Sequence, residues 1–242
     1  MTHLANYAPA LPHGPIREVF PNVFLVEGLF RMAPGFTITR NMAILRQGSE
    51  LTLVNSVRLT ESGLRELDSL GKVKHLFKLG AFHGIDDPFY VHRYHPTFWA
   101  PPGSRHEGDL HHTAELVPQA RPRPDLRVFA FEHGKQPEVA LLLEQDGGIL
   151  LTCDSYQNWE SFDGCSLFAK VVMRGMGFGP KVVGGPWTKA MGQDVRQDLE
   201  RLCSEPFAHL VPAHGAVLRD TAQDGLREAI RKRFGGGTKP VA

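Results

Sequence analysis

Two segments of the sequence place a metal-ligand type of side chain directly after a run of apolar residues. Residues 150–154 read Leu-Leu-Thr-Cys-Asp and end at Asp154, and residues 210–215 read Leu-Val-Pro-Ala-His-Gly and contain His214. Carboxylate oxygens and imidazole nitrogens are the usual protein ligands of catalytic zinc and iron. Taken singly, Asp154 could cap a turn, and His214 could hydrogen-bond within its own turn. The pair is a candidate metal site if the fold brings the two segments together.

Further ligand-type side chains occur in two other segments. The segment 80–88 follows the apolar run 73–79, reads Gly-Ala-Phe-His-Gly-Ile-Asp-Asp-Pro and supplies His83, Asp86 and Asp87. The other segment precedes a predicted hairpin and supplies His133. With Asp154 and His214, these N and O ligands could hold one divalent ion and leave a position open for water, but a second ion would lack ligands. Asp87 could instead be a simple turn residue before proline, and His133 could be exposed or capped.

Strands and helices alternate in an order that would bring these segments to strand ends. Residues 139–143 and 149–152, joined by Gln-Asp-Gly-Gly, form the clearest β-hairpin, and residues 208–211 form a later strand. In the first half, Thr60 fits the N-cap of a helix that carries Leu64, Leu67 and Leu70 on one face. Thr221 and Asp224 form a capping-box pattern at the start of the last helix.

The pattern predicts a single domain over residues 1–242, built from two similar halves that meet at about residue 120. Each half runs from strands through a helix to a second polar strand end. Five residues within apolar strand runs are expected in the core: Leu53, Leu141, Leu142, Leu150 and Val211. A cluster of three histidines, His106, His111 and His112, lies in a segment rich in proline and glycine and is expected to be a solvated loop.

Composition limits the partners that this protein could have. Lysine and arginine number 27 and aspartate and glutamate 26, so the chain lacks the field that attracts nucleic acid or anionic membranes. No run approaches the roughly 18 apolar residues of a membrane span, and residues 1–15 lack the regions of a secretion signal. We therefore expect a cytoplasmic protein that acts on a small molecule, with no nucleic-acid or membrane partner. Cys153, Cys165 and Cys203 are widely spaced and are expected to be reduced, partly buried thiols.

Together, these segments resemble the metallo-β-lactamase superfamily over nearly the whole chain. In that superfamily a "GD" segment after a hairpin and a "GHG" segment after a later strand supply metal ligands, and Asp154 and His214 match them. Residues 16–27 resemble its opening strand, and 41–45 with 53–56 resemble its next hairpin, with Asn55 where an aspartate is usual. The segment 132–134 resembles the one that carries the middle histidine ligand, here His133. The resemblance implies an α/β protein with a four-layer αβ/βα sandwich and a site at one edge between two sheets.

The sequence departs from the superfamily at its first motif, H-x-H-x-D-H. Only His83 remains in the corresponding loop. If His83 matches the second histidine of the motif, Asp86 replaces the final histidine, whereas a shift of one residue brings in Asp87 instead. The loop is similar to that of a branch of the superfamily in which this first histidine motif is degenerate.

The leading functional hypothesis is a metal-dependent hydrolase with a reduced, mononuclear site. His83, His133, Asp154 and His214 would hold the ion, which we expect to be zinc, with iron or no ion as the alternatives. The ion would activate water for attack on an ester, thioester, amide or phosphoester, and Asp86 or Asp87 would orient that water or act as general base. The competing hypothesis is a noncatalytic ligand-binding or structural protein that retains the scaffold.

Overall fold

The computed structural model describes Tyr7 and residues 9–235, which form two compact units. Unit 1 runs to Glu115 and also contains Asp163–Ala169, and unit 2 contains Leu116–Phe162 and the chain from Lys170 onward. The boundary at Glu115 lies close to the predicted division of the chain, but the return of Asp163–Ala169 to unit 1 was not predicted. Each unit has its own sheet and its own apolar core.

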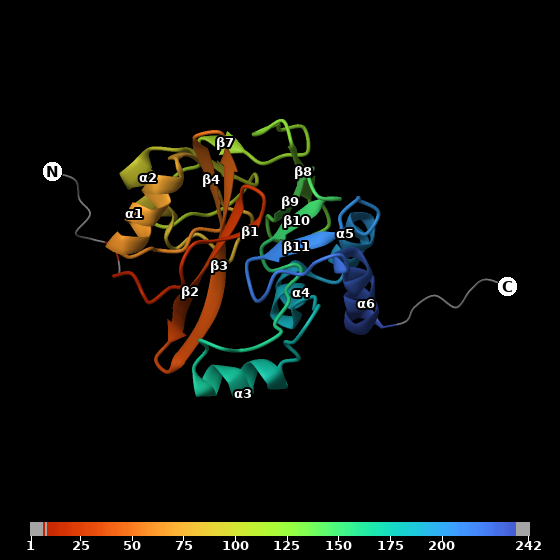
Figure 1. Ribbon diagram of the computed structural model, residues 1–242. Coiled ribbons are helices and arrows are strands. Elements are labelled where there is room, and N and C mark those ends of the chain that lie inside the picture. The colour runs from red at the N-terminus through yellow and green to blue at the C-terminus, as the bar shows by residue number, and fades with distance from the viewer. Residues whose placement is uncertain (1–6, 8, 236–242) are drawn as a thin grey trace. The chain divides into compact units, whose positions relative to one another are not determined.

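Unit 1 contains a seven-stranded sheet whose strands follow one another in chain order (Figure 1). Its strands are β1 (Arg17–Phe20), β2 (Val23–Ala33), β3 (Phe36–Gln47), β4 (Glu50–Val54), β5 (Lys72–Phe77), β6 (Thr97–Ala100) and β7 (Ala114–Glu115). The first four pair antiparallel, and β4 to β7 pair parallel. The change of direction follows from the connections, because tight turns join antiparallel strands whereas parallel neighbours need a longer crossover.

Helix α1 (Glu61–Leu70) lies in the β4–β5 crossover and α2 (Asp87–Tyr94) in the β5–β6 crossover, and the two helices lie together on one side of this sheet (Figure 1). The predicted N-cap is present, since the Thr60 hydroxyl accepts a hydrogen bond of 3.3 Å from Gly63 N. Leu64 and Leu67 of α1 and Phe89 and Tyr90 of α2 pack against alternate residues of the sheet in one buried cluster. Burial of the apolar faces of α1 and α2 against the sheet stabilises the unit and fixes the position of the segment between β5 and α2.

Unit 2 contains a four-stranded sheet in the order β11-β10-β9-β8. Its strands are β8 (Leu126–Ala130), β9 (Val139–Leu143), β10 (Ile149–Thr152) and β11 (His209–Pro212). The predicted β9–β10 hairpin is confirmed, and β11 pairs parallel to β10. Gly148 is required in the turn, because its φ is +95° and a Cβ there would lie 2.5 Å from Pro206 O.

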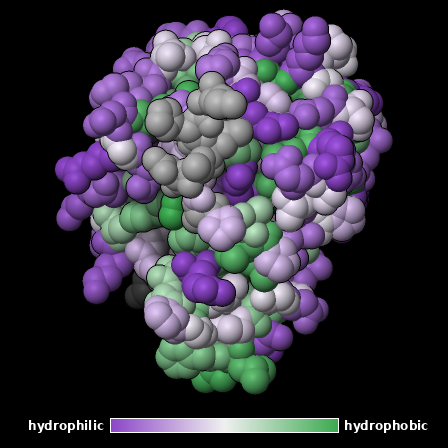
Figure 2. All heavy atoms as spheres, turned by 90° about the vertical axis from the view of Figure 1, so that its left-hand side faces the viewer, coloured by the Kyte–Doolittle hydropathy of each residue, from purple (hydrophilic) through white to green (hydrophobic). Residues whose placement is uncertain are grey.

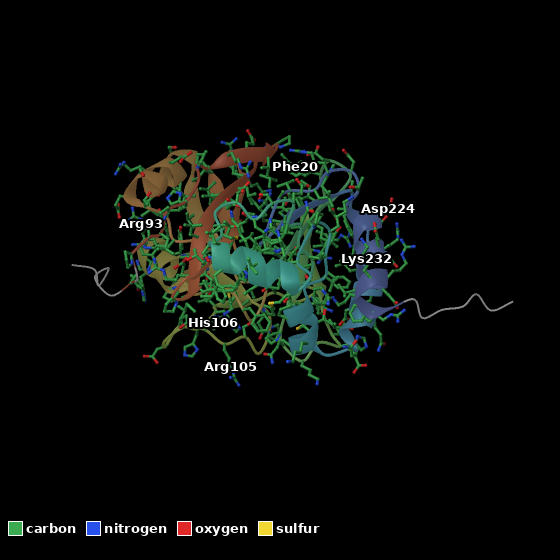
Figure 3. All side chains as sticks on the ribbon, turned by 90° about the horizontal axis from the view of Figure 1, so that it is seen from below. Phe20, Arg93, Arg105, His106, Asp224 and Lys232 are labelled. Atoms are coloured by element: carbon green, nitrogen blue, oxygen red, sulfur yellow. The ribbon has the colours of Figure 1, made fainter. Side chains whose placement is uncertain are left out.

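Four helices complete the described chain: α3 (Leu167–Gly175), α4 (Gly185–Met191), α5 (Val195–Leu202) and α6 (Ala222–Phe234). Apolar residues of α4, α5 and α6 share one core cluster with Leu142, Leu150 and Leu210 of the unit 2 sheet. The predicted capping box at the start of α6 is wrong, because Thr221 makes no side-chain cap hydrogen bond and its hydroxyl donates to Arg219 O instead. Asp224 and Lys232 of α6 extend outward (Figure 3).

The predicted core and the predicted cysteine states are confirmed. Leu53, Leu141, Leu142, Leu150 and Val211 are each no more than 2% exposed. The three cysteines are free and buried. Together, the mixed sheets and their helices confirm the predicted α/β fold class, because each unit supplies one sheet layer and one helical layer.

The surface is mixed in character. Figure 2 shows a mainly polar face, with an apolar area at its lower end. Exposed apolar side chains of α3 include Leu167, Phe168 and Val171. Among the described helices, none is both long and apolar enough to cross a membrane.

Candidate metal centre

Parallel pairing of β10 and β11 brings Asp154 and His214 together. Thr152 lies opposite Pro212 at the ends of the two strands, so the segments after β10 and β11 leave the sheet at the same end. Asp154 and His214 each follow their strand end by two residues. His214 Nε2 lies 3.3 Å from Asp154 Oδ1, and the side chains are only 8% and 13% exposed. The two ligand-type residues singled out in the sequence are therefore neighbours in unit 2.

The position of His214 is fixed by an aromatic ring and by a close backbone contact. Its imidazole stacks on Trp159, with ring centroids 5.4 Å apart and an interplanar angle of 18°. Asn158 N donates a hydrogen bond of 3.2 Å to His214 O. Gly215 has φ +85°, and a Cβ there would lie 2.1 Å from Asn158 O. Only glycine therefore allows the chain after His214 to pass this close to residue 158.

Asp154 is held by its neighbours in the same loop. Gln157 Nε2 donates to Asp154 Oδ1 at 3.2 Å and to the Asp154 carbonyl at 3.1 Å, while Gln157 Oε1 accepts from Trp159 Nε1 at 2.7 Å. Cys153 Sγ lies 3.7 Å from Asp154 Oδ2 as a thiol donor. Burial, and then the Asp154 carboxylate, raise the pKa of Cys153 well above its usual value, so the thiol stays protonated.

A buried glutamate holds the backbone next to Asp154. Glu138 accepts a hydrogen bond of 2.7 Å from Trp187 Nε1 and one of 3.1 Å from Ser155 N. Burial, and then the nearby Asp154 carboxylate, raise the pKa of Glu138 to about 8. Sequence reasoning missed Glu138, Gln157 and Trp159, because none of them belongs to a ligand pattern. The only available signal was a charged residue beside the apolar run of β9.

The geometry of the pair fits a divalent ion. A tetrahedral ion with bonds of about 2.0–2.2 Å holds its ligand atoms about 3.4 Å apart. The 3.3 Å between His214 Nε2 and Asp154 Oδ1 matches that spacing and exceeds the distance of about 2.9–3.0 Å that is usual for an N–H···O hydrogen bond. Both side chains are mostly buried and are oriented by other residues, as metal ligands are.

His133 has a different partner. Its Nδ1 lies 3.0 Å from Asp198 Oδ1, and its backbone N donates to Asp198 Oδ2 at 2.8 Å. Asp198 is a fully buried residue of α5 that also accepts from Arg201 at 3.0 Å, whereas the His133 side chain is 43% exposed. These contacts connect the chain before β9 to α5. The sequence pattern gave no indication of this contact between His133 and Asp198.

The Asp86 carboxylate of unit 1 is used by two donors. Its Oδ2 pairs with Arg40 Nη2 and accepts a hydrogen bond of 2.7 Å from Arg58 N. Asp86 precedes α2 but makes no side-chain cap bond to that helix. The carboxylate therefore joins β3 to the segment that precedes α1.

Asp87 is fully buried and is more than a turn residue. Its Oδ1 accepts a hydrogen bond of 2.6 Å from the Ser56 hydroxyl. Burial raises the pKa of Asp87 to about 6, against the opposing effects of Ser56 and Lys78. Gly84, with φ +110°, leaves the necessary space, because a Cβ there would lie 2.6 Å from Asp87 Oδ2. His83, in the same segment, is 8% exposed.

The histidine cluster is not a simple solvated loop, which corrects the expectation from composition. His106 Nε2 lies 2.9 Å from His112 Nδ1, and the His106 ring contacts Phe98 edge-on at 4.9 Å. Burial, and then Lys78 and His112, lower the pKa of His106 to about 4, so it is neutral at pH 7. His111 is exposed, as is Arg105 beside His106 (Figure 3).

The fold is that of the metallo-β-lactamases. The FIM-1 metallo-β-lactamase from Pseudomonas aeruginosa, in its mono-zinc form, aligns with a TM-score of 0.64 and 11% identity over 94% of this chain and 99% of its own length. The metallo-β-lactamase from Erythrobacter litoralis aligns with a TM-score of 0.66 and 12% identity over 90% of this chain and 96% of its own. DIM-1 metallo-β-lactamase, in a crystal exposed to ceftazidime, aligns with a TM-score of 0.63 and 13% identity over 94% and 99%.

The comparisons by sequence add no relative. No protein-family model matches the chain, and no curated protein matches it. At 11–13% identity the structural likeness establishes the metallo-β-lactamase fold. It carries no substrate or ligand set with it, because one fold supports many functions.

Proposed function

We propose that this protein is a metal-dependent hydrolase with one divalent ion that is held by Asp154 and His214. Zinc is the first candidate for this ion. The observation that carries the proposal is the 3.3 Å between His214 Nε2 and Asp154 Oδ1 at the end of two parallel strands. A catalytic zinc has three protein ligands and an open position, so a third donor is needed. His83 is proposed for it because it is the one histidine of the segment that resembles the first metal motif of the superfamily.

A bound divalent ion would lower the pKa of its water toward about 7 and would stabilise negative charge on the substrate oxygen. The protein's own part is to hold the ligands rigidly. Trp159 keeps the His214 ring in one orientation, and Gln157 does the same for the Asp154 carboxylate. Glu138 fixes Ser155 N directly after Asp154. These contacts reduce the reorganisation needed when a small-molecule ester, amide, thioester or phosphoester binds.

Of the two carboxyl groups proposed to orient the water, Asp87 is the better candidate. The Asp86 carboxylate is committed to Arg40 and to the backbone of Arg58. The pKa of Asp87, raised to about 6, is closer to neutral pH, where a general base is most effective. We therefore propose Asp87 as the general base and assign Asp86 a structural role.

A second candidate function is a noncatalytic ligand-binding protein on the same fold. One observation favours it: the segment that resembles the first metal motif retains one histidine, and the neighbouring Asp86 forms an ion pair with Arg40. In that case Asp154 and His214 would contact each other and stabilise the segments that follow β10 and β11. Metal content separates the two candidates.

Metal content and hydrolysis should be measured together. Purified protein loaded with zinc, dialysed and assayed by elemental analysis should retain about one ion per chain, and Asp154→Ala or His214→Ala should lose it. His133→Ala should retain the ion if Asp154, His214 and His83 are its protein ligands. Loss of zinc from this variant would add His133 to the ligands, because a histidine whose Nδ1 contacts a carboxylate can bind zinc through Nε2. Hydrolysis of a panel of nitrophenyl esters and phosphoesters should follow metal content. Retention of zinc by both ligand variants, or no zinc in the wild type, would contradict the proposed centre.

A further inference from the structure

Unit 1 contains a cavity of about 840 Å³ whose lining residues all belong to that unit. Its walls come from the distal part of β2, from the start of α2 and from the loop 107–111. Segment 12–14 runs along the same part of β2, where Leu29 N donates to Pro12 O and Gly14 N donates to Glu27 O. The volume lies within the range of small-molecule sites, about 300–1,000 Å³.

Two arginines of the cavity wall have buried donors without acceptors. The Arg40 side chain is 7% exposed; its Nη2 pairs with Asp86, but its Nε has no hydrogen-bond partner. Arg58 lies over the Phe89 ring, and its buried Nε and Nη1 have no partner. Burial lowers the pKa of Arg58 from its usual value, although the group stays charged at neutral pH. Both arginines line the cavity, on the side formed by β3 and the segment before α1.

The other charged groups of the wall do not neutralise these donors. Asp86 is already used by Arg40 Nη2 and by Arg58 N. Glu107 and Asp109 are exposed on the facing loop, where water and salt screen them. Arg31 adds a third guanidinium at the exposed rim. Buried donors without acceptors are costly, and a guanidinium matches the geometry of a carboxylate or phosphate in particular.

We propose that this cavity binds an amphipathic acid whose oxyanion contacts Arg58 and Arg40 and whose apolar body lies along the rest of the wall. The wall next to the two arginines is mainly apolar, and its members include Leu11, Leu29, Phe30, Ile85, Phe89 and Leu110. A carboxylate and a phosphate monoester share the required head-group chemistry. An uncharged analogue of equal length lacks the group that the two arginines recognise.

The test is calorimetric titration of the full-length protein with octanoate, octyl phosphate and octanol. At least one of the two acids should bind about tenfold tighter than octanol or more, because a hydrogen bond to a charged group contributes that much. Arg58→Gln should reduce this preference to about twofold or less. Arg46→Gln is the matched control and should retain it, because Arg46 also lies over a phenylalanine, Phe24, but does not line the cavity.

A second variant separates the cavity from the charge. Ile85→Trp keeps both arginines and places a bulky indole ring at a residue that is 49% exposed and lines the cavity, so it should weaken the binding of both acids and of octanol alike. The relative affinities of octanoate and octyl phosphate identify the preferred head group. The proposal is overturned if octanol binds as tightly as the acids, if none of the three binds up to its solubility limit, or if Arg58→Gln retains the preference.

Discussion

Glu138 offers a quantitative test of how the loop of Asp154 is supported. The Glu138 carboxyl accepts hydrogen bonds from Trp187 Nε1 and Ser155 N and is only 2% exposed. Glu138→Ala removes both acceptors, and each buried donor left without one costs about 1–3 kcal/mol. The variant should therefore lose about 2–6 kcal/mol of unfolding free energy. Because the pKa of Glu138 is raised to about 8, its carboxyl is mostly neutral at pH 6.

Trp187 Nε1 and Ser155 N donate to different oxygens of Glu138, and glutamine replaces one of these oxygens with an NH2 group that cannot accept. Glu138→Gln should therefore leave one donor without an acceptor and lose about 1–3 kcal/mol at pH 6, about half the loss in Glu138→Ala. The assay is urea unfolding of wild type, Glu138→Ala and Glu138→Gln at pH 6, followed by tryptophan fluorescence and circular dichroism. A loss of stability in the glutamine variant equal to that in the alanine variant would show that the remaining amide oxygen supports neither donor. An alanine variant as stable as the wild type would show that the two donors do not depend on Glu138.

Three further predictions test other parts of the structure. Gly215→Ala should abolish zinc retention and lower thermal stability, because φ is +85° at this position and the new Cβ would lie 2.1 Å from Asn158 O. Gly175→Ala is the control and should retain zinc, because no atom lies within 4 Å of its Cβ position. Because the pKa of Asp87 is raised from 3.8 to about 6, the unfolding free energy should be highest below about pH 3.8 and should fall by about 3 kcal/mol as the pH rises through about 6. Urea unfolding of Asp87→Asn at pH 4 to 8 should show a weaker pH dependence. Asp198→Asn should destabilise the protein without loss of zinc, since Asp198 holds His133 and Arg201; loss of zinc would instead connect His133 with the metal.

Much of the architecture follows from local sequence signals. The β9–β10 hairpin is marked by two apolar runs on either side of Asp-Gly-Gly, and α1 is marked by Thr60 and its leucine periodicity. Helix α2 was missed because Asp87-Pro88 has the appearance of a turn, although proline is also favoured in the first turn of a helix. Helices α3 and α4 were missed because they flank a glycine-rich stretch that favours a loop.

The candidate site was only partly accessible from the sequence. Asp154 and His214 could be found because each follows an apolar strand, and the parallel pairing of those strands brings them together. Glu138 and Asp198 could not be found, because their roles depend on long-range contacts with Ser155, Trp187 and His133. The ion pair of Asp86 with Arg40 joins positions 46 residues apart, and a single sequence carries no signal for it.

The metal itself is the central claim, and a crystal of the zinc-loaded protein tests it most directly. Anomalous diffraction at the zinc edge should show one peak about 2.0–2.2 Å from both His214 Nε2 and an Asp154 carboxylate oxygen, with His83 as the third protein ligand. A zinc-loaded crystal with no peak within about 3 Å of either Asp154 or His214 would contradict the proposed centre.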